Sequence, residues 1–90
     1  MIRQTLTQIR MTEKEIKNFL IEQSETIQLG FDEKGYPLIA CWKIDNYHYS
    51  FYCRFCKRIH NHGLGNGHRV SHCSYWNKGY VLVLQGDLTQ

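Results

Sequence analysis

One stretch, Cys53 to Cys73, constrains the fold of this chain more than any other. Its 21 residues contain three of the four cysteines and four of the five histidines, and they contain no Asp or Glu. Thiolates and imidazoles are the ligands that structural zinc takes in its closed, four-coordinate sites. The sequence therefore predicts a bound metal ion, and the sulfur-rich ligand set favours Zn²⁺.

Two of the four ligands follow directly from the spacing. Cys53 and Cys56 form a C-x-x-C pair, in which one tight turn aims two thiolates at a single ion. We expect His68 and Cys73 to complete the site, because they follow at a separation that a glycine-containing loop can close. The predicted metal ligands are therefore Cys53, Cys56, His68 and Cys73.

Two other histidines are alternative ligands. His72 precedes Cys73 directly, and adjacent residues of an extended chain point to opposite faces, so this pair shares one ion only through a local kink. His60 follows Cys56 at a spacing that lets the chain curl onto the same ion. A disulfide, or free core cysteines with surface histidines, are the non-metal alternatives. Cys41 and His48, on facing strands, are interpreted as packing residues.

The chain length makes a structural metal useful. Ninety residues form one domain, residues 1–90, whose apolar core is marginal at this size without a staple. The first residues show no apolar segment typical of a signal peptide, and no run approaches the ~18 apolar residues of a membrane helix. We therefore expect a cytoplasmic protein, in which reduced thiols favour metal over a disulfide.

Local patterns predict an α+β fold. Thr12 and Glu15 form a capping-box motif, and Ile16, Phe19 and Leu20 recur at helical spacing, so we expect a helix over about 12–23. A sheet and zinc knuckle should follow over about 26–84. We expect a small antiparallel meander of about four strands with a zinc-ribbon-like hairpin, and a tail from residue 85. The expected strands cover 26–31, 38–44, 47–53 and 80–84, with a short return strand at 58–61.

Charge is distributed unevenly along the chain. Between Asn46 and Gly86 there is no acidic residue, whereas basic and aromatic residues are interleaved there. Cations follow a phosphate backbone and exposed aromatic rings stack on bases, so this half predicts nucleic-acid binding, to DNA or RNA. The predicted contact residues are Arg54, Lys57, Arg58, Arg69 and Lys78, with Tyr75 and Trp76 as stacking side chains.

Two other functions remain open from the sequence. The knuckle could present a loop to a host or viral protein, which would make the chain a protein-binding adaptor or inhibitor. A metal-dependent hydrolase is the third reading, but it needs an open coordination position, and four good ligands favour a closed, non-catalytic site. The loop Gly63 to Gly67 lacks the Gly-Lys-Ser/Thr ending of a P-loop, which argues against a nucleotide cofactor.

The run Y-C-R-F-C-K-R-x-H-x-H-G-x-G-x-G-H-R-V-x-H-C, followed by Y-V-L-V, resembles a group of small zinc-knuckle proteins of phages, prophages and bacterial genomes. The resemblance covers about residues 52–84 and leaves out the helix and the first hairpin. It implies a zinc site and a mobile-element setting, and it does not extend to an activity. The chain departs from the pattern at Arg54 and Lys57, where Pro and Gly are common in knuckles.

Overall fold

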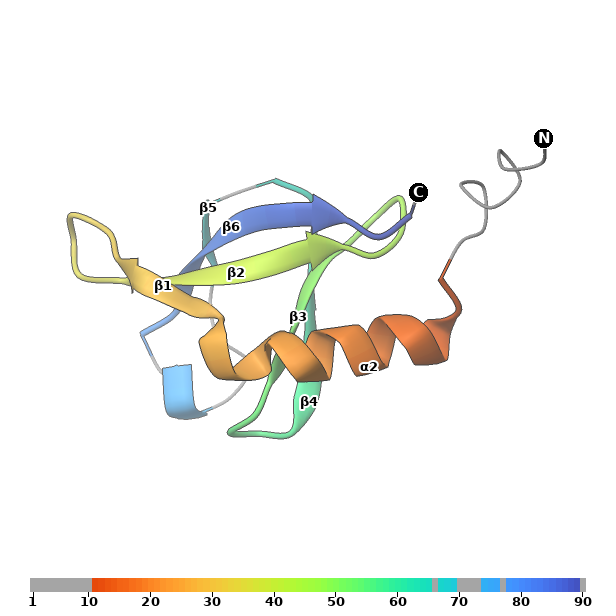
Figure 1. The fold of residues 1–90 in the computed structure, drawn as a ribbon. Coiled ribbons are helices and arrows are strands. Elements are labelled where there is room, and N and C mark those ends of the chain that lie inside the picture. Colours follow the sequence, from red (N-terminus) through yellow and green to blue (C-terminus); the bar gives the residue numbers. More distant parts are fainter. Residues whose placement is uncertain (1–10, 66, 70–73, 77, 90) are drawn as a thin grey trace.

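In a computed structural model, residues 11–65, 67–69, 74–76 and 78–89 are described (Figure 1). Within them, one α-helix, α2 (Glu13–Gln23), and a single 3₁₀ turn, η1 (Ser24–Thr26), precede the sheet, and a second 3₁₀ turn, η2 (Ser74–Trp76), interrupts it. The expected α+β class is confirmed. The strands are β1 (Gln28–Phe31), β2 (Pro37–Lys43), β3 (Tyr49–Cys53), β4 (Arg58–His62), β5 (Gly67–Arg69) and β6 (Tyr80–Asp87).

Helix α2 begins where its capping box predicts. The Thr12 hydroxyl oxygen accepts a hydrogen bond from the Glu15 amide at 3.1 Å, and the Glu15 carboxylate accepts one from the Thr12 amide at 2.8 Å. Two amide groups that the first turn leaves without helical partners are thereby satisfied. At the other end the Ser24 hydroxyl donates to the Ile21 carbonyl at 2.7 Å. The helix is thus held at both ends by its own sequence.

The sheet has the strand order β4-β3-β2-β6-β5, and β1 pairs with the first residues of β2. All pairings are antiparallel except β2 with β6, which is parallel. The sequence does not predict this central parallel pair, nor the short strand β5. The expected tail from residue 85 is also wrong in part, because Gly86 and Asp87 continue β6 by pairing with Trp42 and Lys43.

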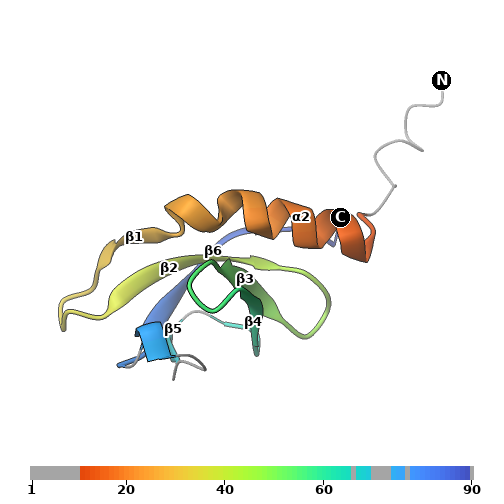
Figure 2. The ribbon, with the colours of Figure 1, turned by 90° about the horizontal axis from the view of Figure 1, so that it is seen from below.

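Strand β2 lies at the centre of the domain. Its consecutive residues Ile39 to Trp42 are all buried, which shows that both faces of the strand are covered. On one face Phe19 of α2 packs edge-on against Trp42, with ring centroids 5.3 Å apart. Figure 2 shows α2 lying along this side of the sheet and η2 on the opposite side.

On the face away from α2, a second group of rings fills the core. Phe51 of β3 packs edge-on against Tyr80 of β6 at 5.2 Å and lies 4.8 Å from the His60 ring of β4. Phe51 and Tyr80 have no exposed surface, and His60 is 4 % exposed. A histidine of the cysteine- and histidine-rich stretch is therefore part of the hydrophobic core.

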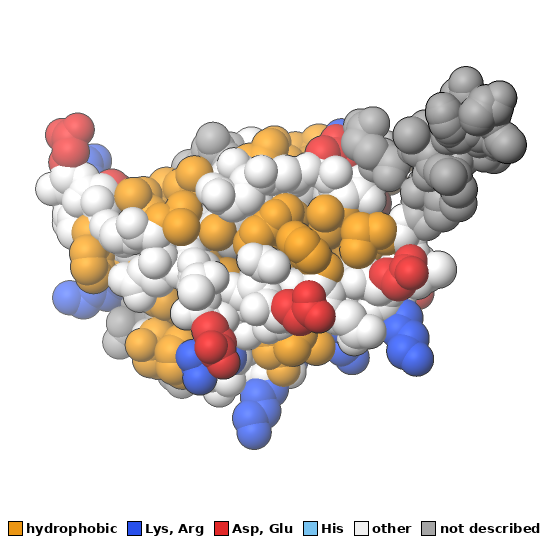
Figure 3. All heavy atoms as spheres, in the orientation of Figure 1, with side chains coloured by type: hydrophobic (Ala, Val, Ile, Leu, Met, Phe, Trp, Pro, Cys, Tyr) orange, Lys and Arg blue, Asp and Glu red, His pale blue; other side chains and the backbone are white. Residues whose placement is uncertain are grey.

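The surface that carries α2 has mixed charge. Figure 3 shows acidic and basic side chains interspersed on this face. Among the described residues, no helix is long and apolar enough to cross a membrane.

Candidate metal centre

The turn between β3 and β4 forms the knuckle. Cys53, the last residue of β3, pairs with Arg58, the first of β4, and the Cys53 carbonyl accepts a hydrogen bond from the Lys57 amide at 2.7 Å. Lys57 takes a left-handed backbone conformation with φ = 59°. This conformation favours glycine, which explains why glycine is common at the matching position of other knuckles. The turn forms here with a lysine in that place.

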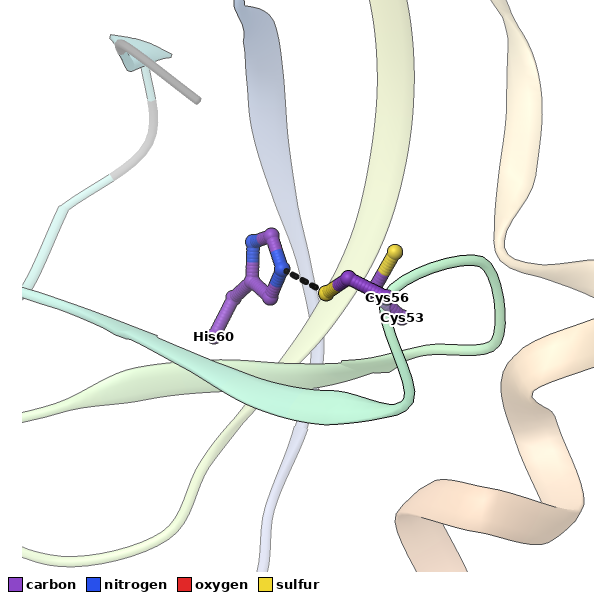
Figure 4. Close-up of side chains that lie close together, drawn as sticks. All are labelled: Cys53, Cys56 and His60. Atoms are coloured by element: carbon purple, nitrogen blue, oxygen red, sulfur yellow. Dashed lines mark hydrogen bonds between the residues drawn. The ribbon is translucent and has the colours of Figure 1, made fainter. Parts of the chain in front are cut away.

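Three ligand side chains converge at the knuckle. The candidate ligand atoms of Cys53, Cys56 and His60 all lie within 4.8 Å of one another. The His60 Nε2 atom is 3.1 Å from Cys56 Sγ, as the close-up in Figure 4 shows. Cys53 and His60 are buried, and Cys56 is half-buried. The cluster therefore offers two sulfurs and one nitrogen, shielded from solvent, to a metal ion.

The dimensions of this cluster fit a tetrahedral metal ion. With a metal–sulfur bond of about 2.3 Å and a metal–nitrogen bond of about 2.0 Å, a sulfur and a nitrogen on one zinc ion lie roughly 3.5 Å apart. The observed separation of 3.1 Å between Cys56 Sγ and His60 Nε2 is slightly shorter. The other separations in the group are at most 4.8 Å. The group could thus hold a metal with little change in the backbone.

Tyr80 and His62 form a chain of hydrogen bonds with His60 on the side of its ring away from Cys56. The Nδ1 atom of His60 lies 2.9 Å from the Tyr80 hydroxyl, and this hydroxyl lies 2.7 Å from Nε2 of His62. With a metal at His60 Nε2, Nδ1 carries the proton and donates to Tyr80, and the Tyr80 hydroxyl donates to His62. Such outer contacts fix the orientation and basicity of a ligating imidazole.

Burial raises the pKa of the Cys53 thiol. The backbone amides of Cys56 and Phe55 and the indole N–H of Trp76 act in the opposite direction, because they favour the thiolate. The indole nitrogen is buried and has no hydrogen-bond partner of normal geometry among the described residues. A cation bound at Cys53 would stabilise the thiolate and give this N–H group a charged sulfur to face.

Of the ligands considered above, the structure brings together two predicted cysteines and one alternative histidine. His60, expected as an alternative, joins Cys53 and Cys56. The backbone of His68 is described, and it pairs with Val81 of β6. The residue before Val81 is Tyr80, whose hydroxyl contacts His60 and whose backbone pairs with Arg69. The predicted ligand Cys73 and the alternative ligand His72 lie outside the described residues.

The segment that follows Cys73 packs on the knuckle. The Tyr75 ring of η2 stacks on the Phe55 ring at a centroid distance of 3.6 Å and an interplanar angle of 9°. Trp76 packs edge-on against both rings and against Tyr80. In the sequence, only Ser74 separates Tyr75 from Cys73.

Cys41 and His48 do not join the cluster. Burial raises the pKa of the Cys41 thiol to about 12, and Arg69 opposes this effect. His48 Nδ1 lies 3.0 Å from the Asp45 carboxylate within the β2–β3 turn. The three described cysteines, Cys41, Cys53 and Cys56, are free thiols.

The residues predicted to contact nucleic acid fall into two groups. Arg54, Lys57, Arg58 and Lys78 are exposed on the surface, and Tyr75 is 53 % exposed. Arg69 is half-buried and donates hydrogen bonds to the Gly63 and Gly65 carbonyls, so it closes the glycine-rich loop. Trp76 is only 6 % exposed and forms a wall of the metal cluster.

Tyr80 is the residue of the site that sequence reasoning missed. The pattern YVLVL predicts a buried strand and does not by itself assign a partner to the Tyr80 hydroxyl group. A buried tyrosine hydroxyl needs a hydrogen-bond partner, and this was the available signal. The partners are His60 and His62 of β4. The sequence predicts a strand there but does not predict that it lies close to β6.

The fold and the cluster define this chain as a small α+β domain with a candidate metal centre in a knuckle. Comparison with protein-family models, with curated proteins and with solved structures finds no match.

Proposed function

We propose that this chain is a zinc-stabilised domain with Cys53, Cys56 and His60 as three of its ligands. The convergence of three ligand atoms within 4.8 Å carries this proposal. Cys73 supplies the fourth ligand, with His72 as the alternative. The stacking of Tyr75 on Phe55 supports this choice, because it anchors the chain just after Cys73 to the knuckle. A set of three thiolates and one imidazole is typical of structural zinc.

In this proposal His60 replaces His68, which the sequence alone favours. The support is the position of the His60 Nε2 atom beside Cys56 and the hydrogen bond of its other nitrogen to Tyr80. A ligating histidine commonly uses its second nitrogen in this way. With four protein ligands the site has no open coordination position, so we assign it a structural role without catalysis.

We further propose that the knuckle end binds nucleic acid. The supporting observation is an exposed aromatic stack, Phe55 on Tyr75, surrounded by exposed cations. The Arg54 guanidinium lies 5.9 Å from the centre of the Phe55 ring, and Lys57 and Arg58 are exposed on the same turn. Cations that hold phosphates beside rings that stack on bases are the usual means of binding single strands.

The zinc proposal is tested by metal content and coordination. Purified protein should contain one zinc ion per chain, and X-ray absorption should show three sulfur neighbours and one nitrogen neighbour. Two sulfurs and two nitrogens would favour His72 over Cys73. A metal content near zero, in protein prepared without chelators, would contradict the proposal, and a bound water would reopen catalysis.

Nucleic-acid binding is tested by its salt dependence. Anisotropy of a labelled single-stranded oligonucleotide should show affinity falling with salt, with a slope of about −0.7 per phosphate contact in a plot of log K against log[salt]. Arg54→Ala and Arg58→Ala should each weaken binding. Lys14→Ala, an exposed lysine of α2, is the matched control and should change little. An affinity that does not change between roughly 50 and 300 mM salt, a range that includes physiological ionic strength, would contradict the proposal.

A protein-binding adaptor is the second candidate. The observation that favours it is the apolar character of the half-exposed Phe55–Tyr75 stack beside the cluster, because aromatic anchors are frequent in protein interfaces. Binding carried by Phe55 and insensitive to salt would support an adaptor. The cytoplasmic location and the mobile-element setting are also proposals, supported by the free thiols and by the motif resemblance.

A further inference from the structure

A hollow of about 450 Å³ lies beside the knuckle, between the β1–β2 turn on one side and η2 with Lys78 and Gly79 on the other. Its volume is within the range of pockets that take small ligands. All of its lining residues lie outside the cysteine- and histidine-rich stretch, three of them in the β1–β2 turn and one at the first position of β2. The lining residues are Lys34, Gly35, Tyr36, Pro37, Tyr75, Trp76, Lys78 and Gly79.

Two lysines from distant parts of the chain face this hollow. Lys34 and Lys78 are both exposed, and each directly precedes a glycine with a left-handed backbone. Gly35 (φ = 89°) donates its amide to the Asp32 carbonyl, and Gly79 (φ = 85°) donates its amide to the Trp76 carbonyl. The backbone of each lysine is therefore fixed at the rim of the hollow by a tight turn whose glycine few other residues could replace.

One side of the hollow is formed by the ring of Tyr75, which stacks on Phe55 of the knuckle. Tyr75 lines the hollow and is 53 % exposed, while Phe55 supports its ring from one side. A ring fixed in this way loses little conformational freedom when a planar group stacks on it. The hollow thus combines a preorganised stacking surface with two cations.

The acidic residues of the turn leave the hollow accessible to an anion. The Asp32 carboxylate accepts hydrogen bonds from the Lys34 and Tyr36 amides, both at 2.9 Å, so it is engaged within the turn. Glu33 is exposed on the same turn and partly offsets the positive charge. Two lysines facing one hollow still favour a phosphate group there.

We propose that this hollow binds one nucleotide of a single strand, with its base on Tyr75 and its phosphate between Lys34 and Lys78. This inference rests on the proposed nucleic-acid function and specifies its ligand. A base in a duplex is stacked on its neighbours and cannot lie flat on a side chain, whereas an unpaired base can. The geometry therefore selects single-stranded over double-stranded nucleic acid.

The test compares labelled octamers of dT and rU with a 12-base-pair duplex by fluorescence anisotropy at fixed salt. Single strands should bind roughly tenfold more tightly than the duplex, and Tyr75→Ala should remove about the same factor. Lys34→Ala and Lys78→Ala should each weaken single-strand binding about three- to tenfold. Tyr75→Phe, which keeps the ring, and Lys14→Ala, which removes the same charge elsewhere, should stay within about twofold of wild type.

The controls separate this inference from the proposed function. Lys34 is exposed and outside the metal site, so Lys34→Ala keeps the test valid if Tyr75→Ala disturbs the knuckle or its metal content. If Lys34→Ala behaves as Lys14→Ala does, while Arg54→Ala weakens binding, the hollow is not the site although nucleic-acid binding stands. If no oligonucleotide binds at all, both proposals fail. Amide chemical-shift changes at Gly35 and Gly79 on adding the octamer would support the hollow directly.

Discussion

The hydroxyl group of Tyr80 lies 2.9 Å from Nδ1 of His60, and this contact joins the last strand of the sheet to the candidate metal ligand. β4 and β6 are separated by β3 and β2 in the strand order, so the sheet must curl for the two side chains to meet. The buried core and the metal cluster therefore share residues. A substitution at Tyr80 should therefore alter metal binding at His60.

Tyr80→Phe tests this connection. The change removes one hydroxyl group that lies between two buried histidines and keeps the ring that packs on Phe51. Because buried polar atoms lose a partner, we expect the free energy of unfolding to fall by about 2 kcal/mol. Metal affinity should fall about 10- to 100-fold, since His60 loses the contact that orients it. Competition with a chromophoric chelator measures the affinity.

Tyr47→Phe is the matched control for this prediction. Tyr47 is 73 % exposed in the β2–β3 turn, so loss of its hydroxyl group should alter neither stability nor metal binding. Equal effects of the two substitutions would show that the Tyr80 contact has no special role.

Lys57→Gly should stabilise the protein. Lys57 has φ = 59°, a left-handed conformation that costs a side-chain-bearing residue roughly 1–2 kcal/mol. Glycine removes this strain, but its greater conformational entropy favours the unfolded chain. The free energy of unfolding should therefore rise by only about 0.5–1 kcal/mol. Chemical denaturation of the zinc-loaded protein measures the change. Lys57→Ala removes the same charge and keeps the strain, so a gain of equal size in that variant would refute the explanation.

Features that depend on neighbouring residues could be predicted from the sequence. The capping box of Thr12 and Glu15 sets the start of α2, and the C-x-x-C pair of Cys53 and Cys56 sets the knuckle turn. Both use hydrogen bonds or ligands within a few residues of one another. The helix and the two cysteines of the cluster were accordingly predictable.

Features that depend on distant pairing could not be predicted. The contact between His60 and Tyr80 depends on which strand faces β6, and the parallel pairing of β2 with β6 brings Tyr80 to that place. Residues 44–79 separate the two strands, and no local pattern specifies their register. The hollow at Lys34 has the same origin, since its two lysines meet only in the folded chain.

Cys41 should be the least reactive of the cysteines. Its side chain has no exposed surface, and burial raises its pKa to about 12, so almost no thiolate forms at neutral pH. After chelation of the metal, iodoacetamide at pH 8 should modify the knuckle cysteines first. Peptide mapping by mass spectrometry identifies the modified residues. Early alkylation of Cys41 in folded protein would contradict its placement in the core.

The same thiol gives the stability a pH dependence. The folded-state pKa of Cys41 lies above the unfolded value, so the folded protein holds this proton more tightly. Below the unfolded pKa, near 8.5, the thiol is protonated in both states and stability is unaffected. As the pH rises from there toward 12, the unfolded state ionises first, and stability falls. Wild type should therefore lose about 1–2 kcal/mol more than Cys41→Ala between about pH 8 and pH 10.5.

Substitution of the two candidate histidines should identify the ligand. Because His60 places a nitrogen beside Cys56 and holds its other nitrogen on Tyr80, His60→Ala should abolish tight zinc binding and lower the melting temperature. His68→Ala should keep one metal per chain, because we assign that histidine no ligand role. Co²⁺ substitution provides the readout, since its visible absorption reports a tetrahedral site and its thiolate bands report the sulfur ligands. The reverse result, with binding lost in His68→Ala and kept in His60→Ala, would restore the ligand set that the sequence alone predicts. His60→Cys is a further test. If position 60 faces the ion, this variant should bind Co²⁺ with a stronger thiolate-to-metal charge-transfer absorption than wild type, whereas a residue that only packs in the core would not produce this increase.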